Sequence, residues 1–141
     1  MEQLLRTAML DWLRAGPAPL DRLNGVTEES PDAASAPCLA IAASASADWS
    51  TKTQAGREVR LALELVTRAD PLEDAVLHAA IDARVSALPR RQTGVAIASI
   101  TFLRARTRQG ERGLRTTLLE YRIRALADGP RPNLTDSGDF R

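Results

Sequence analysis

The chain has 141 residues, of which 44% are hydrophobic and 26% charged, with a formal net charge of +1. This length and composition predict one globular domain with a sizeable core and exclude a disordered chain. A single cysteine excludes an internal disulfide, and one Cys with one His leaves few soft ligands for a metal. No apolar run approaches a membrane span, and residues 1–16 lack a secretory hydrophobic region, so we expect a soluble, cytoplasmic protein.

Charge is distributed unevenly along the chain. Residues 1–88 carry 8 basic and 13 acidic residues, a net charge of −5, whereas residues 89–141 carry 11 basic and 5 acidic residues, a net charge of +6. Of the 19 basic residues, 18 are Arg and one is Lys52, which reflects either coding bias or selection for planar, bidentate contacts. An acidic and a basic half allow copies to pair head-to-tail, and the basic half is equally suited to phosphate.

The N-terminal segment predicts a helix followed by a connector. Apolar side chains recur every three or four positions over residues 2–14, which is typical of an amphipathic helix, and Gly16 and Pro17 end it. Residues 17–36 are rich in proline and acidic side chains. We therefore expect a connector there, with Val26 inside a short edge strand.

A hairpin is predicted in the middle of the chain. The apolar run at residues 38–43 predicts a strand, and the small polar residues 44–55 predict a long exposed loop. Residues 57–67 alternate between apolar and polar side chains, which predicts a strand with one buried face. The charged side chains expected on its other face are Glu58, Arg60 and Glu64.

The second half of the chain predicts a helix and a second, longer hairpin. Asp70 and Pro71 are the residue types of an N-cap and a first helical position, so a helix is expected to run to about Ala87. Residues 94–107 and 114–126 predict two strands joined by a loop that contains glycine. The helix is expected to lie on the sheet through Leu72, Ala75, Val76, Ala79, Ala80 and Ala83, with Leu77 and Ile81 widening the apolar side.

These elements predict an α+β domain over residues 1–127, followed by a flexible tail at residues 128–141. We expect a mostly antiparallel sheet of four or five strands with two helices packed on one face. The other face should carry charged side chains, which suit solvent or a polar interface. These are Arg60, Glu64, Glu120, Arg122 and Arg124.

One segment resembles a known family. Residues 48–58 read Asp-Trp-Ser-Thr-Lys-Thr-Gln-Ala-Gly-Arg-Glu and lead into the alternating strand. With the strand that follows Pro37 and the final hairpin that ends at residues 121–126, this motif resembles the tail-completion or tail-terminator family of long-tailed bacteriophages and phage-like gene transfer agents. The resemblance covers roughly residues 2–127. The long connector and the Pro-Gly tail depart from shorter members, so neither is assigned by analogy.

The resemblance implies a structural virion protein with a small α/β fold that assembles as a hexameric ring. Such proteins cap the head-proximal end of the tail tube, stop its polymerisation and dock the tail to the capsid connector. The implied partners are further copies of the chain, the tail tube protein and the connector or stopper protein. DNA would at most pass through the ring without sequence-specific binding. No cofactor, enzyme activity or membrane is implied, and assembly would take place in the host bacterial cytoplasm.

The predicted loop contains the first candidate interface. Trp49 is expected either to fold back over the sheet edge or to anchor a partner, because Trp is enriched at interface hot spots. Lys52 lies three residues further on. We hypothesise that residues 48–54, with Ser50 and Thr51 among them, contact the tail tube or the neighbouring subunit.

Arginines on the last two strands form the second candidate interface. Arg104, Arg106 and Arg108 alternate along one strand, and Arg112 and Arg115 follow at the start of its partner. We expect these arginines either to form a solvated end of the hairpin or to pair with the acidic half of a neighbouring copy. The least favoured interpretation is that they line a channel for DNA. Further subunit contacts are expected at Arg60, Glu64, Arg122 and Arg124.

Catalytic and metal sites are not expected. Asp74, His78 and Asp82 follow helical spacing, but a span of about 12 Å is too long for one ion, and His78 is expected to be exposed. Cys38 is expected to be a small buried side chain. The alternative function is a small α+β enzyme or ligand-binding domain of the dimeric ferredoxin-like kind, which the aliphatic inward positions disfavour. A nucleic-acid binder is the third, weaker alternative.

Overall fold

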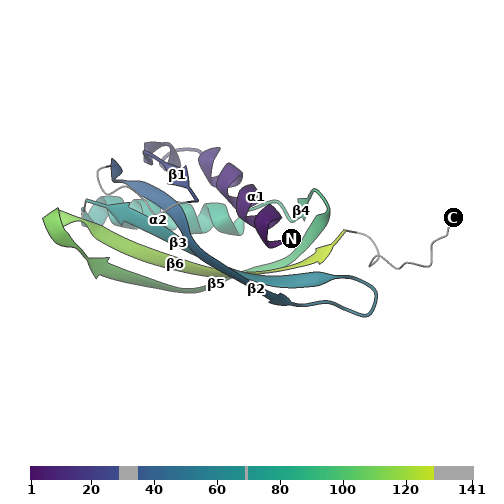
Figure 1. The fold of residues 1–141 in the computed structure, drawn as a ribbon. Helices are drawn as coiled ribbons and strands as arrows, with labels where there is room; N and C mark the ends of the chain where they lie inside the picture. Colours follow the sequence, from purple (N-terminus) through teal and green to yellow (C-terminus); the bar gives the residue numbers. More distant parts are fainter. Residues whose placement is uncertain (29–34, 69, 129–141) are drawn as a thin grey trace.

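The chain folds into two layers, a curved sheet and a pair of helices that cover one of its faces (Figure 1). The computed structural model describes residues 1–28, 35–68 and 70–128. The elements are α1 (Glu2–Arg14), β1 (Val26–Thr27), β2 (Cys38–Asp48), β3 (Gly56–Thr67), α2 (Pro71–Ser86), β4 (Arg91–Gln92), β5 (Val95–Gln109) and β6 (Arg115–Ala127), with 3-10 turns at Leu20–Arg22 and Glu111–Gly113. No helix in these ranges is long and apolar enough to cross a membrane.

The sheet has six strands in the order β1-β2-β3-β6-β5-β4. Every neighbouring pair is antiparallel except β1 and β2, which are parallel, so the sheet is mixed. The α+β class and the short strand at Val26 are confirmed. The strand number is one above the predicted range, because a two-residue strand such as β4 shows no hydrophobic periodicity.

The core lies between the helices and one face of the sheet. On β3 and β6 the predicted alternation is confirmed, since from Val59 to Leu65 and from Thr117 to Ala125 every second residue points to the helices and is buried. The central strands β3 and β6 supply Val59, Leu61, Leu63, Leu65, Leu119, Tyr121 and Ile123. Helix α1 supplies Leu5, Met9, Leu10 and Leu13.

Helix α2 packs through a different face from the one predicted. Its buried residues are Leu77, Ile81 and Val85, spaced four apart, whereas Leu72 is 77% exposed and Val76 is 39% exposed. The prediction was wrong because this helix carries two apolar stripes. The stripe with the larger inward side chains removes more apolar surface from water, and the alanine-rich stripe faces solvent. The Asp70 N-cap is confirmed, because its carboxylate accepts bonds from two backbone amides of the first turn.

Strand β2 is longer than predicted, so the loop that follows it is shorter. The ladder between β2 and β3 extends to the pair Asp48 and Arg57, which leaves residues 49–55 as the loop instead of 44–55. Alanine and serine are weak strand formers, but a paired central strand alongside outweighs that preference. Residues 29–34 of the predicted connector and residues 129–141 of the predicted tail lie outside the described residues.

Candidate interface on the open face of the sheet

The face of β2, β3, β6 and β5 that points away from the helices is the open face. The predicted charged residues of β3 and β6 lie on it, because each alternates with a buried core position. The β5 arginines join them, since Arg104 pairs in register with Glu120, and Arg106 and Arg108 follow at alternate positions. The charged group is Glu58, Arg60, Glu64, Glu120, Arg122, Arg124, Arg104, Arg106 and Arg108. Six arginines against three glutamates give these side chains a net charge of +3.

One ion-pair cluster centres on Glu58. The Arg124 Nε donates to Glu58 Oε1 over 3.0 Å, and the Arg60 Nε lies 3.7 Å from Glu58 Oε2. The hydrogen bond from Arg124 is the largest cause that lowers the pKa of the Glu58 carboxyl, with the charges of Arg124, Arg60 and Arg122 adding to it. Glu58 therefore stays ionised to a lower pH than an ordinary glutamate and pairs with these arginines on the face.

A second cluster centres on Glu120. The Arg104 Nε donates to Glu120 Oε1 over 3.0 Å, and Arg106 Nη2 donates to Oε2 over 3.4 Å. Both arginines are about 60% exposed, so each pair contributes little stability in water. Arg122 lies between the two clusters, and its Nε is buried without a hydrogen-bond partner. The open face therefore holds more cationic donors than its own carboxylates satisfy.

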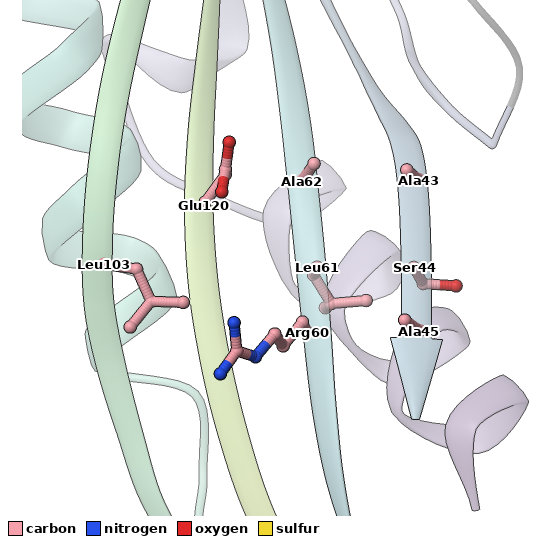
Figure 2. A pocket seen from close by; sticks show the side chains of 8 residues that line it. All are labelled: Ala43, Ser44, Ala45, Arg60, Leu61, Ala62, Leu103 and Glu120. Atoms are coloured by element: carbon pink, nitrogen blue, oxygen red, sulfur yellow. The ribbon is translucent and has the colours of Figure 1, made fainter. Parts of the chain in front are cut away.

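Beside these clusters, small side chains leave shallow cavities in the open face. A shallow cavity of about 160 Å³ lies among the residues drawn in Figure 2. Alanines of β2 and β3 form its apolar floor together with Leu103 of β5, and Arg60 and Glu120 are its charged lining residues. Leu103 reaches this side through the bulge between Phe102 and Arg104, which the sequence pattern does not reveal. A larger hollow of about 350 Å³ includes Glu64, Arg106 and Arg108.

The loop at residues 49–55 folds back against the end of the sheet. The Trp49 amide donates to the Gly56 carbonyl over 3.0 Å, and Gln54 Nε2 donates to the Ala127 carbonyl over 3.1 Å. The Trp49 ring lies 5.7 Å from the Arg124 guanidinium carbon. Of the two predicted positions for Trp49, the structure places it folded back and half-buried next to β6, whereas Lys52 is exposed.

Arg115 does not join the other arginines. It lies on the helix side of β6, where its Nη1 is 3.0 Å from Asp74 Oδ2, while Arg112 lies at the hairpin tip.

His78 lines a hollow of about 240 Å³ together with Asp74 and Arg115. It is half-buried, so the expectation of an exposed residue was wrong. In the described ranges, no three His, Cys, Asp or Glu side chains come together as a metal site.

The open face defines the class of protein. It is broad, charged and only shallowly hollowed, which suits contact with other protein chains better than enclosure of a small molecule. Cys38 is buried, as predicted. This face is compatible with a subunit that assembles with other protein chains.

Comparison with known proteins identifies the family. The family described as Tail completion protein gp17 matches residues 7–126, and the chain belongs to that family. A chain in the solved structure described as "Virion of native gene transfer agent (GTA) particle" has a similar fold, with a TM-score of 0.74 and 23% sequence identity over 89% of this chain and 96% of that one. No curated protein sequence matches the chain. The family resemblance carried by residues 48–58 is therefore confirmed, and the chain has a structural role in a phage-type tail.

Proposed function

We propose that the chain is a tail terminator of a phage or phage-like particle. Copies of it form a ring, with six as the expected number, at the head-proximal end of the tail tube. The ring stops tube polymerisation and docks the tail to the capsid connector or stopper protein. The observation that carries this proposal is the match to a tail completion family over residues 7–126, which includes nearly all of the two-layer fold.

The open face and the loop at residues 49–55 are the proposed contact surfaces. The excess positive charge of the open face favours acidic protein surfaces, and charge complementarity steers such encounters. Lys52 is the exposed charge of the loop and, together with Ser50 and Thr51, is offered to the tail tube or the neighbouring subunit. Trp49 supports the loop through its contact with Arg124. DNA passes through the ring without sequence-specific binding.

Inactivating the gene in a particle-producing host tests this function. Electron microscopy should show heads separated from tails, and tails of uncontrolled length, with both defects reversed by the wild-type gene. Joined particles with tails of normal length in the inactivated strain would contradict the proposal.

Complementation with loop variants then tests the proposed contact. Lys52→Glu should leave the unfolding temperature nearly unchanged, because surface substitutions usually change stability by less than about 0.5 kcal/mol. It should nevertheless lower the fraction of joined particles. Thr7→Glu, on the exposed side of α1, is the matched control and should join normally. If both variants gave the same fraction of joined particles, the loop would not be part of the contact surface.

A further inference from the structure

Two long strands of the sheet have open edges. Within the described residues, β1 pairs only with Leu39 and Ala40 of β2, and β4 pairs only with Val95 and Ala96 of β5. Residues 42–47 of β2 and 98–109 of β5 therefore have a partner strand on one side only. Each edge presents backbone N–H and C=O groups to which a further strand can pair.

The β2 edge lacks the features that normally protect an exposed strand. Residues 43–47 read Ala-Ser-Ala-Ser-Ala, without charge or proline, and the only irregularity of the β2–β3 ladder falls before Ala43. Natural edge strands are usually blocked by charges, prolines or bulges, so an unblocked edge marks a place where pairing is used. The alanine side chains also allow another backbone and its side chains to approach closely.

The β5 edge carries arginines and two bulges, between Ile97 and Ser99 and between Phe102 and Arg104, so it is protected against unselective pairing and suits a partner edge that neutralises its charge. Arg104, Arg106 and Arg108 lie on its open-face side, and residues 98–109 contain no acidic residue. Phe102 lies on the helix side of the same edge, stacks edge-on against Tyr121 and remains 48% exposed. A strand added to this edge would cover part of the Phe102 ring.

Carboxylates lie close to the β2 edge on both sides of the sheet. On the helix side, Glu2 accepts a hydrogen bond from Ser44. On the open face, Ala47 pairs in register with Glu58 and Ala45 pairs with Arg60, whereas Glu64 lies farther along, opposite the Ala40 that β1 covers. An arginine on a strand added beside β2 would lie two strand spacings, or about 10 Å, from β3. On the open face it would reach Glu58 across the alanine methyl groups.

The strand directions also match. Successive pairs β2–β3, β3–β6 and β6–β5 are all antiparallel, so β2 and β5 run in opposite directions. A second copy placed beside the first by rotation about an axis along the strands brings its β5 next to β2 as an antiparallel neighbour. This contact is heterologous, and repeating it closes a ring when the rotation divides a full turn.

We propose that neighbouring copies of this chain join by edge-to-edge pairing, with β5 residues 98–109 of one copy added to β2 residues 42–47 of the next. The inference rests on the proposed ring and names the surfaces that build it. A second copy is the occupant because both open edges belong to the same chain and run in opposite directions, and because β5 bears arginines while Glu2 and Glu58 lie beside the β2 edge.

Cross-linking of single-cysteine variants tests the pairing directly. Ala45→Cys and Arg106→Cys are prepared separately, mixed under assembly conditions with tail tube protein, and treated with a bismaleimide long enough to tolerate a shift in register. Cys38 is buried and should not react. We expect covalent dimers in the mixture and few in either variant alone. Strong cross-linking of Ala45→Cys alone would overturn the proposal in favour of a two-fold β2–β2 contact, and no cross-linking in the mixture would overturn it as well.

An edge charge gives an independent readout. Ala45→Lys places a cation opposite the neighbour's arginines and should raise the protein concentration for half-assembly by about tenfold or more, which corresponds to about 1.4 kcal/mol per contact. Ala83→Lys, on the exposed side of α2, is the matched control and should assemble like the wild type. Equal assembly by both variants would overturn the edge pairing. The terminator role would survive that result, because it is judged separately by tail length in the inactivated strain.

Discussion

Gly56 shows how one residue fixes the loop against the sheet. A Cβ at this position would lie 2.8 Å from Leu126 Cδ2 and 3.0 Å from the Ala125 carbonyl oxygen, and it would also overlap the Trp49 carbonyl. Gly56→Ala should therefore destabilise the fold by about 1–3 kcal/mol, the usual cost of overpacking. Urea unfolding measures the difference. Gly25→Ala is the control, because its Cβ would meet nothing closer than 4.0 Å. If both variants lost the same free energy of unfolding, the close backbone contacts at Gly56 would not be the reason for a glycine there.

Because Glu58 is charged, its contribution to the stability of the folded protein should depend on pH. The folded-state pKa of this carboxyl is lowered from its usual 4.5, chiefly by the hydrogen bond from Arg124. A lowered pKa contributes stability that is present above the unfolded value and disappears as pH falls through the folded value. The unfolding temperature of Glu58→Gln should thus be below that of the wild type at pH 7. The two temperatures should converge as pH falls below the usual 4.5 and through the lowered folded-state pKa.

Glu111→Gln, an exposed change at the hairpin tip, is the control for that comparison and should match the wild type throughout. A Glu58→Gln difference that stays constant from about pH 7 to about pH 2 would show that the carboxylate charge is not its source.

At the scale of elements, a reciprocal contact joins the two helices. Trp12 Nε1 donates to the Arg84 carbonyl over 2.6 Å, and Arg84 Nε donates to the Trp12 carbonyl over 2.9 Å. The Arg84 guanidinium carbon also lies 3.3 Å from the centre of the Trp12 ring. Arg84→Ala should lower the free energy of unfolding by about 2 kcal/mol, because a charged hydrogen bond and a cation–π contact are both lost. Arg22→Ala, at an exposed position, should cost far less in the same urea titration, and equal costs would contradict the importance of the contact.

The elements differ in how far they could be predicted from sequence. Strands β3 and β6 have strict alternation, so their existence, their buried faces and their charged faces were all predictable. The orientation of α2 was not, because two apolar stripes compete and only the packed sheet selects one. The end of β2 was hidden by its Ala-Ser composition, since its pairing depends on β3 rather than on its own residues.

At the scale of the whole molecule, the site was predictable in composition but not in geometry. The charged side chains of the open face follow from alternation, and the motif at residues 48–58 together with the order of the predicted elements indicates the family. Which arginine pairs with which glutamate, the separation of Arg115 from the other arginines and the open edges of β2 and β5 all depend on strand order. Strand order is a long-range property that no local pattern carries.

The most direct test of the terminator role is growth of tail tubes from purified tube protein with and without this chain. Electron microscopy with a gold-labelled chain measures both tube length and label position. We expect shorter tubes at higher concentrations of the chain, with label at one end only. Tubes of unchanged length, or label spread along their walls, would contradict the terminator role.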